Sequence, residues 1–127
     1  MDVLVGYDGS DAAKRALSLA ASLAGDGRLT IANVAPALRF GLPDPLFAEE
    51  QESLLAEALA LVGREEGTAA VGLVGDAADE LARVAAEAGA GLVAVGTNGR
   101  GAVGRFLVGS VSLALARQAP TDVLVVP

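Results

Sequence analysis

The stretch GLVAVGTNGRGAVGRFLVGSVSLALARQAPTDVLVVP, residues 91–127, places a glycine-rich loop and a helical pattern between two apolar segments. The segments GLVAVG (91–96) and VLVVP (123–127) are continuous apolar runs, which is typical of strands covered on both faces in a parallel sheet. The pattern SVSLALARQA begins at Ser110 and is closed by Pro120, so it predicts a helix. We therefore expect a strand, a loop, a helix and a second strand in this order.

The preceding residues show the same alternation. Apolar runs predict strands at residues 3–6, 29–34 and, more weakly, 68–74. Capping residues predict the helices that follow these strands, over about 10–24, 45–63 and 76–88. Such alternation with right-handed crossovers predicts an α/β fold with a doubly wound five-stranded parallel sheet, helices on both faces and strand order 3-2-1-4-5. The length of 127 residues suits a single domain over residues 1–127.

Two helices carry small and aliphatic residues at helical spacing, and we expect these residues to face the sheet. They are Ala13, Ala16, Leu17, Ala20 and Leu23 in the first helix, and Leu81, Ala82, Ala85 and Ala88 in the third. The irregular segment APALRFGLPDP, residues 35–45, is expected to form a mobile flap.

Composition excludes several classes of function. The chain has no cysteine and no histidine, so disulfides, cysteine-ligated zinc, thiol nucleophiles and a Ser-His-Asp triad are excluded. A net charge of −7 argues against binding to nucleic acid or an anionic membrane. No signal peptide and no uncharged stretch long enough to span a membrane is visible. We expect a cytoplasmic protein with neither nucleic-acid nor membrane partners.

The charge is unevenly placed along the chain. Residues 1–88 carry a net charge of −9, whereas residues 89–127 carry a net charge of +2. The glycine-rich loop is therefore a cationic segment in an acidic protein, which points to a small anion such as phosphate. Its Arg100 and Arg105 are either phosphate contacts or solvated loop charges.

Three phosphate-binding patterns can be compared with this loop. Residues 99–104 match G-x-G-x-x-G, but the dinucleotide fingerprint belongs after the first strand, and only one strand remains downstream here. A Walker A interpretation fails because no lysine precedes Ser110. In the third pattern Gly96 leaves room for a sugar or phosphate over the strand tip, and Gly109 and Ser110 begin a helix whose free N–H groups attract an anion.

The spacing Gly96-x2-Gly99-x9-Gly109-Ser110 resembles the ATP-binding signature of the universal stress protein family. The resemblance extends to VLVGYDGSDAAKRAL (3–17) and LTIANVAP (29–36), and so covers the whole chain. It implies a flavodoxin-like fold, ATP held at the ends of strands one and four with Mg²⁺ carried by the nucleotide, and commonly a homodimer.

The resemblance also implies a role for each matching residue. Asp8 should lie by the ribose, flanked by Gly6 and Tyr7, and Val34 should meet adenine through its backbone. Val95, Gly96, Asn98 and Gly99 should line the ribose and phosphates, and Gly109, Ser110 and Val111 should hold the distal phosphates. The sequence departs at Asn33, where many members have histidine, and we expect a small effect. Asp8 has a simpler alternative role, either in capping the first helix or in forming a hydrogen bond within a turn.

No residue stands out as a base that orients a hydrolytic water. We therefore expect a nucleotide-dependent sensor or regulator of the stress response with at most slow ATP hydrolysis. Two alternatives stay open, a stress protein that binds partners but no nucleotide, and a binder of another adenine nucleotide such as cyclic AMP or AMP. The last strand is apolar and lies at the sheet edge in the expected order, so we expect a homodimer through residues 122–127.

Overall fold

The computed structural model describes residues 1–97 and 109–127, in which strands and helices alternate along the chain. The strands are β1 (Val3–Gly6), β2 (Leu29–Ala35), β3 (Thr68–Val74), β4 (Leu92–Gly96) and β5 (Asp122–Val126). The helices are α1 (Asp11–Ala24), α2 (Pro45–Val62), α3 (Ala77–Ala88) and α4 (Ser110–Gln118). Each element predicted from the sequence is present, with small shifts at its ends.

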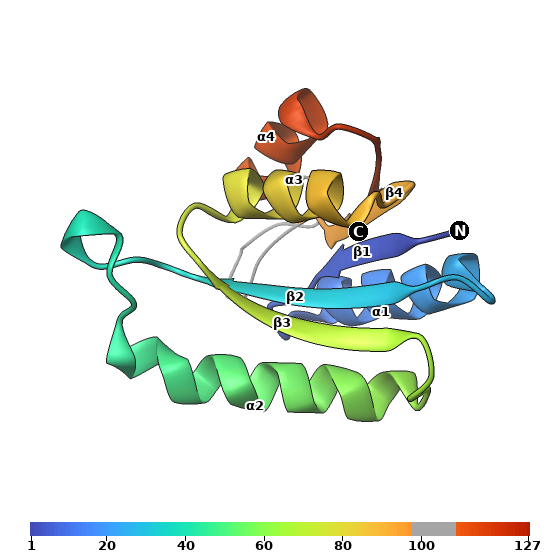
Figure 1. Cartoon of the computed structure of the whole chain (residues 1–127), viewed down its shortest axis with the longest axis horizontal. Helices are drawn as coiled ribbons and strands as arrows, with labels where there is room; N and C mark the ends of the chain where they lie inside the picture. The colour runs from blue at the N-terminus through green and yellow to red at the C-terminus, as the bar shows by residue number, and fades with distance from the viewer. Residues whose placement is uncertain (98–108) are drawn as a thin grey trace.

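The five strands form one parallel sheet in the order β3-β2-β1-β4-β5, which confirms the predicted topology (Figure 1). The central strand β1 pairs with β2 from Val3↔Leu29 to Gly6↔Ala32, and with β4 on its other side. The chain therefore builds outward from β1 in one direction and then in the other. In open α/β sheets this reversal is where ligands bind, beyond the carboxyl ends of the strands.

Helices cover both faces of the sheet. α1 and α2 pack on one face, where Val5 of β1 lies in their core, and α3 and α4 pack on the other, where Leu4 lies (Figure 1). Both side chains are fully buried. Successive strand residues point to opposite faces, so a strand covered on both sides needs an unbroken apolar run, which explains the VLVG pattern.

The predicted capping residues begin three of the helices. Ser10 Oγ accepts a hydrogen bond from the N–H of Ala13, and Asp44 and Asp76 cap α2 and α3 in the same way. The last helix begins at Ser110 as predicted, and Gly109 occupies its N-cap. No side chain caps α4.

Two residues expected to face the sheet do not. Leu23 is exposed and Ala24 is buried in its place, because the buried row of α1 continues from Ala20 by four residues rather than three. Ala88 is also exposed, in the last turn of α3 before the chain turns back toward β4.

The irregular segment after β2 is folded back on itself. The N–H of Leu38 donates to the carbonyl of Leu42 at 2.7 Å, and Ala37 forms an antiparallel bridge with Pro43. At its tip Phe40 has a φ of 65° and its side chain is 97% exposed. The predicted mobility of this segment stays a prediction. Within the described ranges, no helix combines the length and the apolar character that crossing a membrane requires.

Candidate functional site

A cavity of about 480 Å³ opens at the carboxyl edge of the sheet, between the ends of β1, β2 and β4 and the first turns of α3 and α4. Its volume is in the range of small-molecule sites. Every predicted site residue that falls in the described ranges lines it, namely Gly6, Tyr7, Asp8, Val34, Val95, Gly96, Gly109, Ser110 and Val111. The predicted Asn98 and Gly99, with Arg100 and Arg105, lie outside the described residues.

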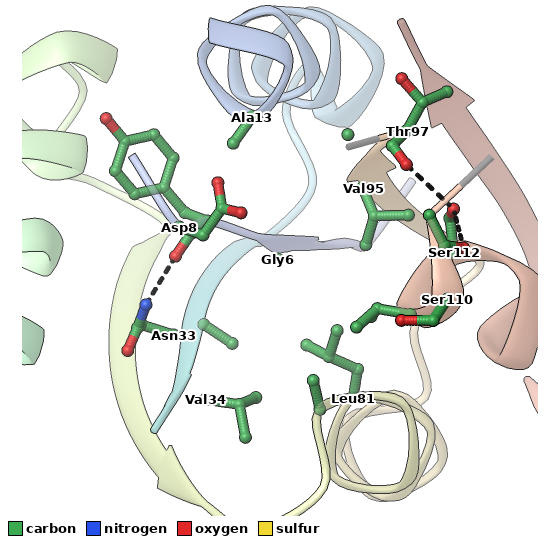
Figure 2. A pocket seen from close by; sticks show the side chains of 16 residues that line it. Gly6, Asp8, Ala13, Asn33, Val34, Leu81, Val95, Thr97, Ser110 and Ser112 are labelled. Atoms are coloured by element: carbon green, nitrogen blue, oxygen red, sulfur yellow. Dashed lines mark hydrogen bonds between the residues drawn. The ribbon is translucent and has the colours of Figure 1, made fainter. Parts of the chain in front are cut away.

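The cavity has an apolar end and a polar end. Figure 2 shows Val34 at one end of the cavity, Ser112 and Thr97 at the other, and Leu81 beside Ser110 between them. Ala32 and Ala77 complete the apolar end. Such a cavity suits an elongated ligand with one flat apolar part and one anionic or polar part.

The apolar end exists because β1 is shorter than β2. β1 stops at Gly6, which pairs with Ala32, whereas β2 continues to Ala35. The N–H of Tyr7 donates to the carbonyl of Ala32 at 2.8 Å, so the peptide groups of Ala32 face β1. Peptide groups alternate in direction along a strand, so those of Val34 face the same side, where β1 has ended. Val34 therefore presents one N–H donor and one carbonyl acceptor to the cavity.

Asp8 lies in the turn between β1 and α1. Its Oδ1 accepts a hydrogen bond from the N–H of Ser10 at 2.9 Å, which is the local structural role weighed from the sequence. The side chain is half-buried and lines the cavity. A carboxylate accepts several hydrogen bonds through two oxygens, so this turn and a ligand can share it.

Gly96 also has a packing role that was not predicted. A Cβ at this position would lie 2.8 Å from Cβ of Ala12, and 3.0 Å from the main-chain N of Ala13. The missing side chain thus makes room for the first turn of α1. The close approach brings α1, β4 and the cavity wall together.

The polar end is formed by the beginning of α4. The N–H of Gly109 donates to the carbonyl of Thr97, and Ser112 Oγ donates to the carbonyl of Gly109 at 2.9 Å. These bonds hold the N-terminus of α4 against the end of β4. The first N–H groups of a helix have no partner within the helix, so those of Ser110 and Val111 are suited to bind an anion.

Several residues of the cavity were not predicted from the sequence. Leu81 was assigned to the core, and its spacing gives no sign that it also lines a cavity. Thr97 was not considered, although its Oγ1 is buried and without a hydrogen-bond partner among the described residues. The sequence offered one sign of Thr97, because this hydroxyl-bearing residue directly follows Gly96, the glycine that ends β4.

Asn33 has a structural role that was not predicted, while the small effect expected of its departure from histidine stays a prediction. Its side chain is buried, and its Nδ2 donates to the carbonyl of Tyr7 at 2.8 Å (Figure 2). Its Oδ1 accepts from Nε2 of Gln51, which lies on α2. Nothing in the local sequence around Gln51 predicts this contact.

Residues 1–97 and 109–127 hold no cluster of three or more carboxylate side chains that would bind a metal ion. The Mg²⁺ expected with a nucleotide therefore finds no ready-made set of protein ligands in this part of the chain. Hard divalent cations of this kind commonly keep water and phosphate oxygens as ligands.

Comparisons with known proteins find relatives in sequence and in fold. A universal stress protein of Thermus aquaticus, encoded in the 3′ region of a QAH/OAS sulfhydrylase, is 36% identical over 135 residues, which cover 98% of this chain and 96% of the relative. The crystal structure of a universal stress protein in complex with cyclic AMP has a TM-score of 0.80 and 28% identity, covering 100% of this chain and 97% of the other.

A universal stress protein of Archaeoglobus fulgidus in complex with dAMP has a TM-score of 0.81 at 22% identity, covering 100% of this chain and 98% of the other, and shows the fold alone. The sequence model of the universal stress protein family matches residues 1–127. The chain belongs to the universal stress protein family.

Proposed function

We propose that this protein binds ATP in the cavity at the carboxyl edge of the sheet and acts as a nucleotide-dependent sensor or regulator in a stress response. The observation that carries the proposal is one cavity with the Val34 peptide groups at its apolar end and the α4 N-terminus at its polar end. A family member that is 28% identical has been solved in complex with cyclic AMP, which supports an adenine nucleotide as the ligand.

The apolar end suits adenine. The N–H of Val34 can donate to adenine N1, and its carbonyl can accept from the 6-amino group. Guanine presents the opposite pattern, with an N–H at N1 and an oxygen at C6, so it would leave both peptide groups unsatisfied at a cost of about 1–3 kcal/mol each. Ala32, Ala77 and Leu81 would pack against the faces of the base.

The remaining site residues extend from the base toward the phosphates. The Gly6–Asp8 segment would lie along the ribose, with the Asp8 carboxylate accepting from its hydroxyl groups. Val95 and Gly96, together with Asn98 and Gly99, would follow the sugar and the first phosphate. The free N–H groups of Gly109–Val111 would hold the distal phosphates with the positive end of the α4 dipole. Mg²⁺ would arrive with the phosphates.

Further parts of the proposal concern assembly and turnover. We propose a single-domain cytoplasmic protein with at most slow ATP hydrolysis, because no described residue of the cavity is a histidine or a carboxylate near its phosphate end. We also propose a homodimer through β5. This strand lies at the edge of the sheet, and its partly buried valines make an open edge prone to association.

Isothermal titration calorimetry with ATP, GTP, AMP and cyclic AMP tests the proposal. We expect ATP to bind, GTP to bind at least about tenfold more weakly, and cyclic AMP to compete with ATP. Saturation to 100 times the Kd adds about 2.7 kcal/mol to the free energy of unfolding, which a thermal melt detects. No heat with any adenine nucleotide, and no shift of the melt in millimolar MgATP, would remove the proposal and leave a stress protein that acts through partners alone.

A matched pair of variants at the α4 N-terminus locates the phosphates. Ser110→Pro removes one N–H at the first helical position, where proline is well tolerated, and the extended Gly109 before it suits a following proline. Ser110→Ala removes the hydroxyl but keeps the N–H. We expect Ser110→Pro to weaken ATP far more than AMP, and Ser110→Ala to weaken ATP less. Equal losses for ATP and AMP would place the distal phosphates elsewhere.

A further inference from the structure

We propose that Gln51 and Glu57, two side chains of α2 that do not line the cavity, are positioning residues for its ribose end. The inference rests on the proposed nucleotide function and deepens it, because it assigns the residues that set how strongly the ribose hydroxyls are bound. Glu57 contacts Tyr7, the residue immediately before Asp8, and Gln51 acts on Tyr7 through Asn33.

Tyr7 is held at its two ends. Its carbonyl accepts a hydrogen bond from Nδ2 of Asn33 at 2.8 Å, and its phenolic hydroxyl donates to the carboxylate of Glu57. Tyr7 is 2% exposed, and its bond with Asn33 is buried, whereas its bond with the exposed Glu57 is part-buried. A hydrogen bond lost in a buried setting is more costly than the same loss at the surface. The main chain that carries Asp8 is therefore fixed from the α2 side of the sheet.

Gln51 fixes the direction of the Asn33 amide. Its Nε2 lies 3.1 Å from Asn33 Oδ1 and 2.9 Å from the Asn33 carbonyl. Because Gln51 Nε2 is a donor, the asparagine must turn its oxygen toward Gln51 and its nitrogen toward the Tyr7 carbonyl. The same Nε2 lies 2.9 Å from the carbonyl of Leu73, so Gln51 also ties β2 to β3 beside the cavity.

The sheet has a space for this side chain. A Cβ at Gly72 of β3 would lie 2.6 Å from Oε1 of Gln51 and 2.9 Å from its Cδ. A glycine in the interior of a strand is unfavourable, and often marks a place where another group approaches closely. Gly72 is thus an independent sign that the Gln51 side chain belongs across the end of β3.

The consequence is a defined path from α2 to the ribose. Gln51 orients Asn33, Asn33 and Glu57 hold Tyr7, and Tyr7 sets the position of the Asp8 carboxylate. None of the α2 side chains needs to touch the nucleotide. Their loss should therefore weaken the contact with the ribose hydroxyls while leaving the contacts with the base and the phosphates in place.

The test compares the Kd values of ATP and 2′,3′-dideoxy-ATP, which lacks both ribose hydroxyls, by calorimetry. For Gln51→Leu we expect the affinity for ATP to fall about fivefold to tenfold, in line with one lost hydrogen bond, and the affinity for dideoxy-ATP to change less than twofold. Gly72→Ala displaces Gln51 without removing it, so it should also weaken ATP more than dideoxy-ATP. This variant replaces Gln51→Leu in the test if Gln51→Leu does not fold.

The Glu57 pair provides a rescue. Glu57→Gln keeps an oxygen that accepts from the Tyr7 hydroxyl and should bind ATP nearly as the natural protein does, whereas Glu57→Leu should lose ATP affinity and keep dideoxy-ATP affinity. Glu52→Gln, an exposed position on the same helix, is the matched control. Leu29→Val, at the opposite end of β2, controls for loss of stability alone.

The outcomes separate the two proposals. If the natural protein binds ATP but Gln51→Leu weakens ATP and dideoxy-ATP equally, or only as much as Leu29→Val does, the positioning role is refuted and nucleotide binding stands. Equal affinity of the natural protein for ATP and dideoxy-ATP would also refute it, because Asp8 then makes no ribose contact. If the natural protein binds no adenine nucleotide, the proposed function fails and this inference fails with it.

Discussion

The close approach of α1 to the tip of β4 makes Gly96→Ala a decisive substitution. The added Cβ would lie 2.8 Å from Ala12 Cβ and 3.0 Å from both the carbonyl carbon of Ala12 and the N of Ala13. Two of these three atoms belong to the main chain of the first turn of α1, so no side-chain rotation removes the clash. We therefore expect Gly96→Ala to destabilise the protein before any nucleotide is added.

The magnitude follows from overpacking in a well-packed core. Forcing a methyl group against backbone costs about 1–3 kcal/mol. For a chain of 127 residues, 2 kcal/mol corresponds to a fall of about 7 °C in the melting temperature. Urea unfolding and a thermal melt of the nucleotide-free protein measure this loss, and calorimetry with ATP then shows whether affinity falls in proportion.

Gly91→Ala is the matched control, because it lies just before the other end of the same strand. A Cβ there would meet the flexible Cε of Met1 at 3.3 Å and main chain only at 3.8 Å. We expect it to change stability little. The packing argument would be refuted if nucleotide-free Gly96→Ala were as stable as Gly91→Ala and yet lost ATP affinity, because the Cβ would then point at the ligand.

Three further predictions concern the surface. A hydrogen bond from Arg83 lowers the pKa of Glu80 below its ordinary value of 4.5, so this pair stabilises the fold above that value and less as pH falls through the lowered pKa. Arg83→Leu should therefore reduce stability slightly at pH 7, and its urea midpoint should approach that of the natural protein near pH 2. Phe40→Asn should raise the free energy of unfolding by up to about 1 kcal/mol, as measured by urea unfolding. A left-handed φ of 65° is unfavourable for phenylalanine, and the exposed Phe40 has little packing to lose. An unchanged urea midpoint would contradict this. Val125→Pro should yield monomers by light scattering and leave the pairing of β5 with β4 intact. The carbonyl of Val126 accepts a hydrogen bond on the β4 side, so the peptide groups of Val125 face the open edge of the sheet. If the variant stayed dimeric, the dimer interface would lie elsewhere on the protein.

The arrangement of elements could be predicted because burial on two faces leaves a direct mark on sequence. A strand such as β1 must be apolar at every position, and capping residues such as Asp44 and Asp76 mark where the helices begin. Leu23 and Ala24 show the limit of this approach. A difference of one residue in helical phase decides which of them is buried, and both fit an amphipathic pattern.

The site was predictable where it uses glycines and helix ends, and not where it uses long-range side-chain contacts. The spacing of Gly96, Gly109 and Ser110 indicated an anion site, but only the packing shows that Gly96 accommodates α1. Gln51 and Asn33 are 18 residues apart on a helix and a strand. Their hydrogen bond depends on how two elements are stacked, and a single sequence carries no periodic sign of that.

Because β1 ends before β2, the base preference of the cavity should tolerate substitutions of its side chains. The two groups that would identify the base at Val34 are peptide atoms, which are the same for every residue type except proline. Replacing Val34 by another β-branched residue should thus leave the base preference unchanged. If β1 were extended so that it also paired with Val34, the N–H and carbonyl of Val34 would be occupied and the base preference would be lost. Discrimination here would be encoded in the length of a neighbouring strand and not in the identity of any side chain.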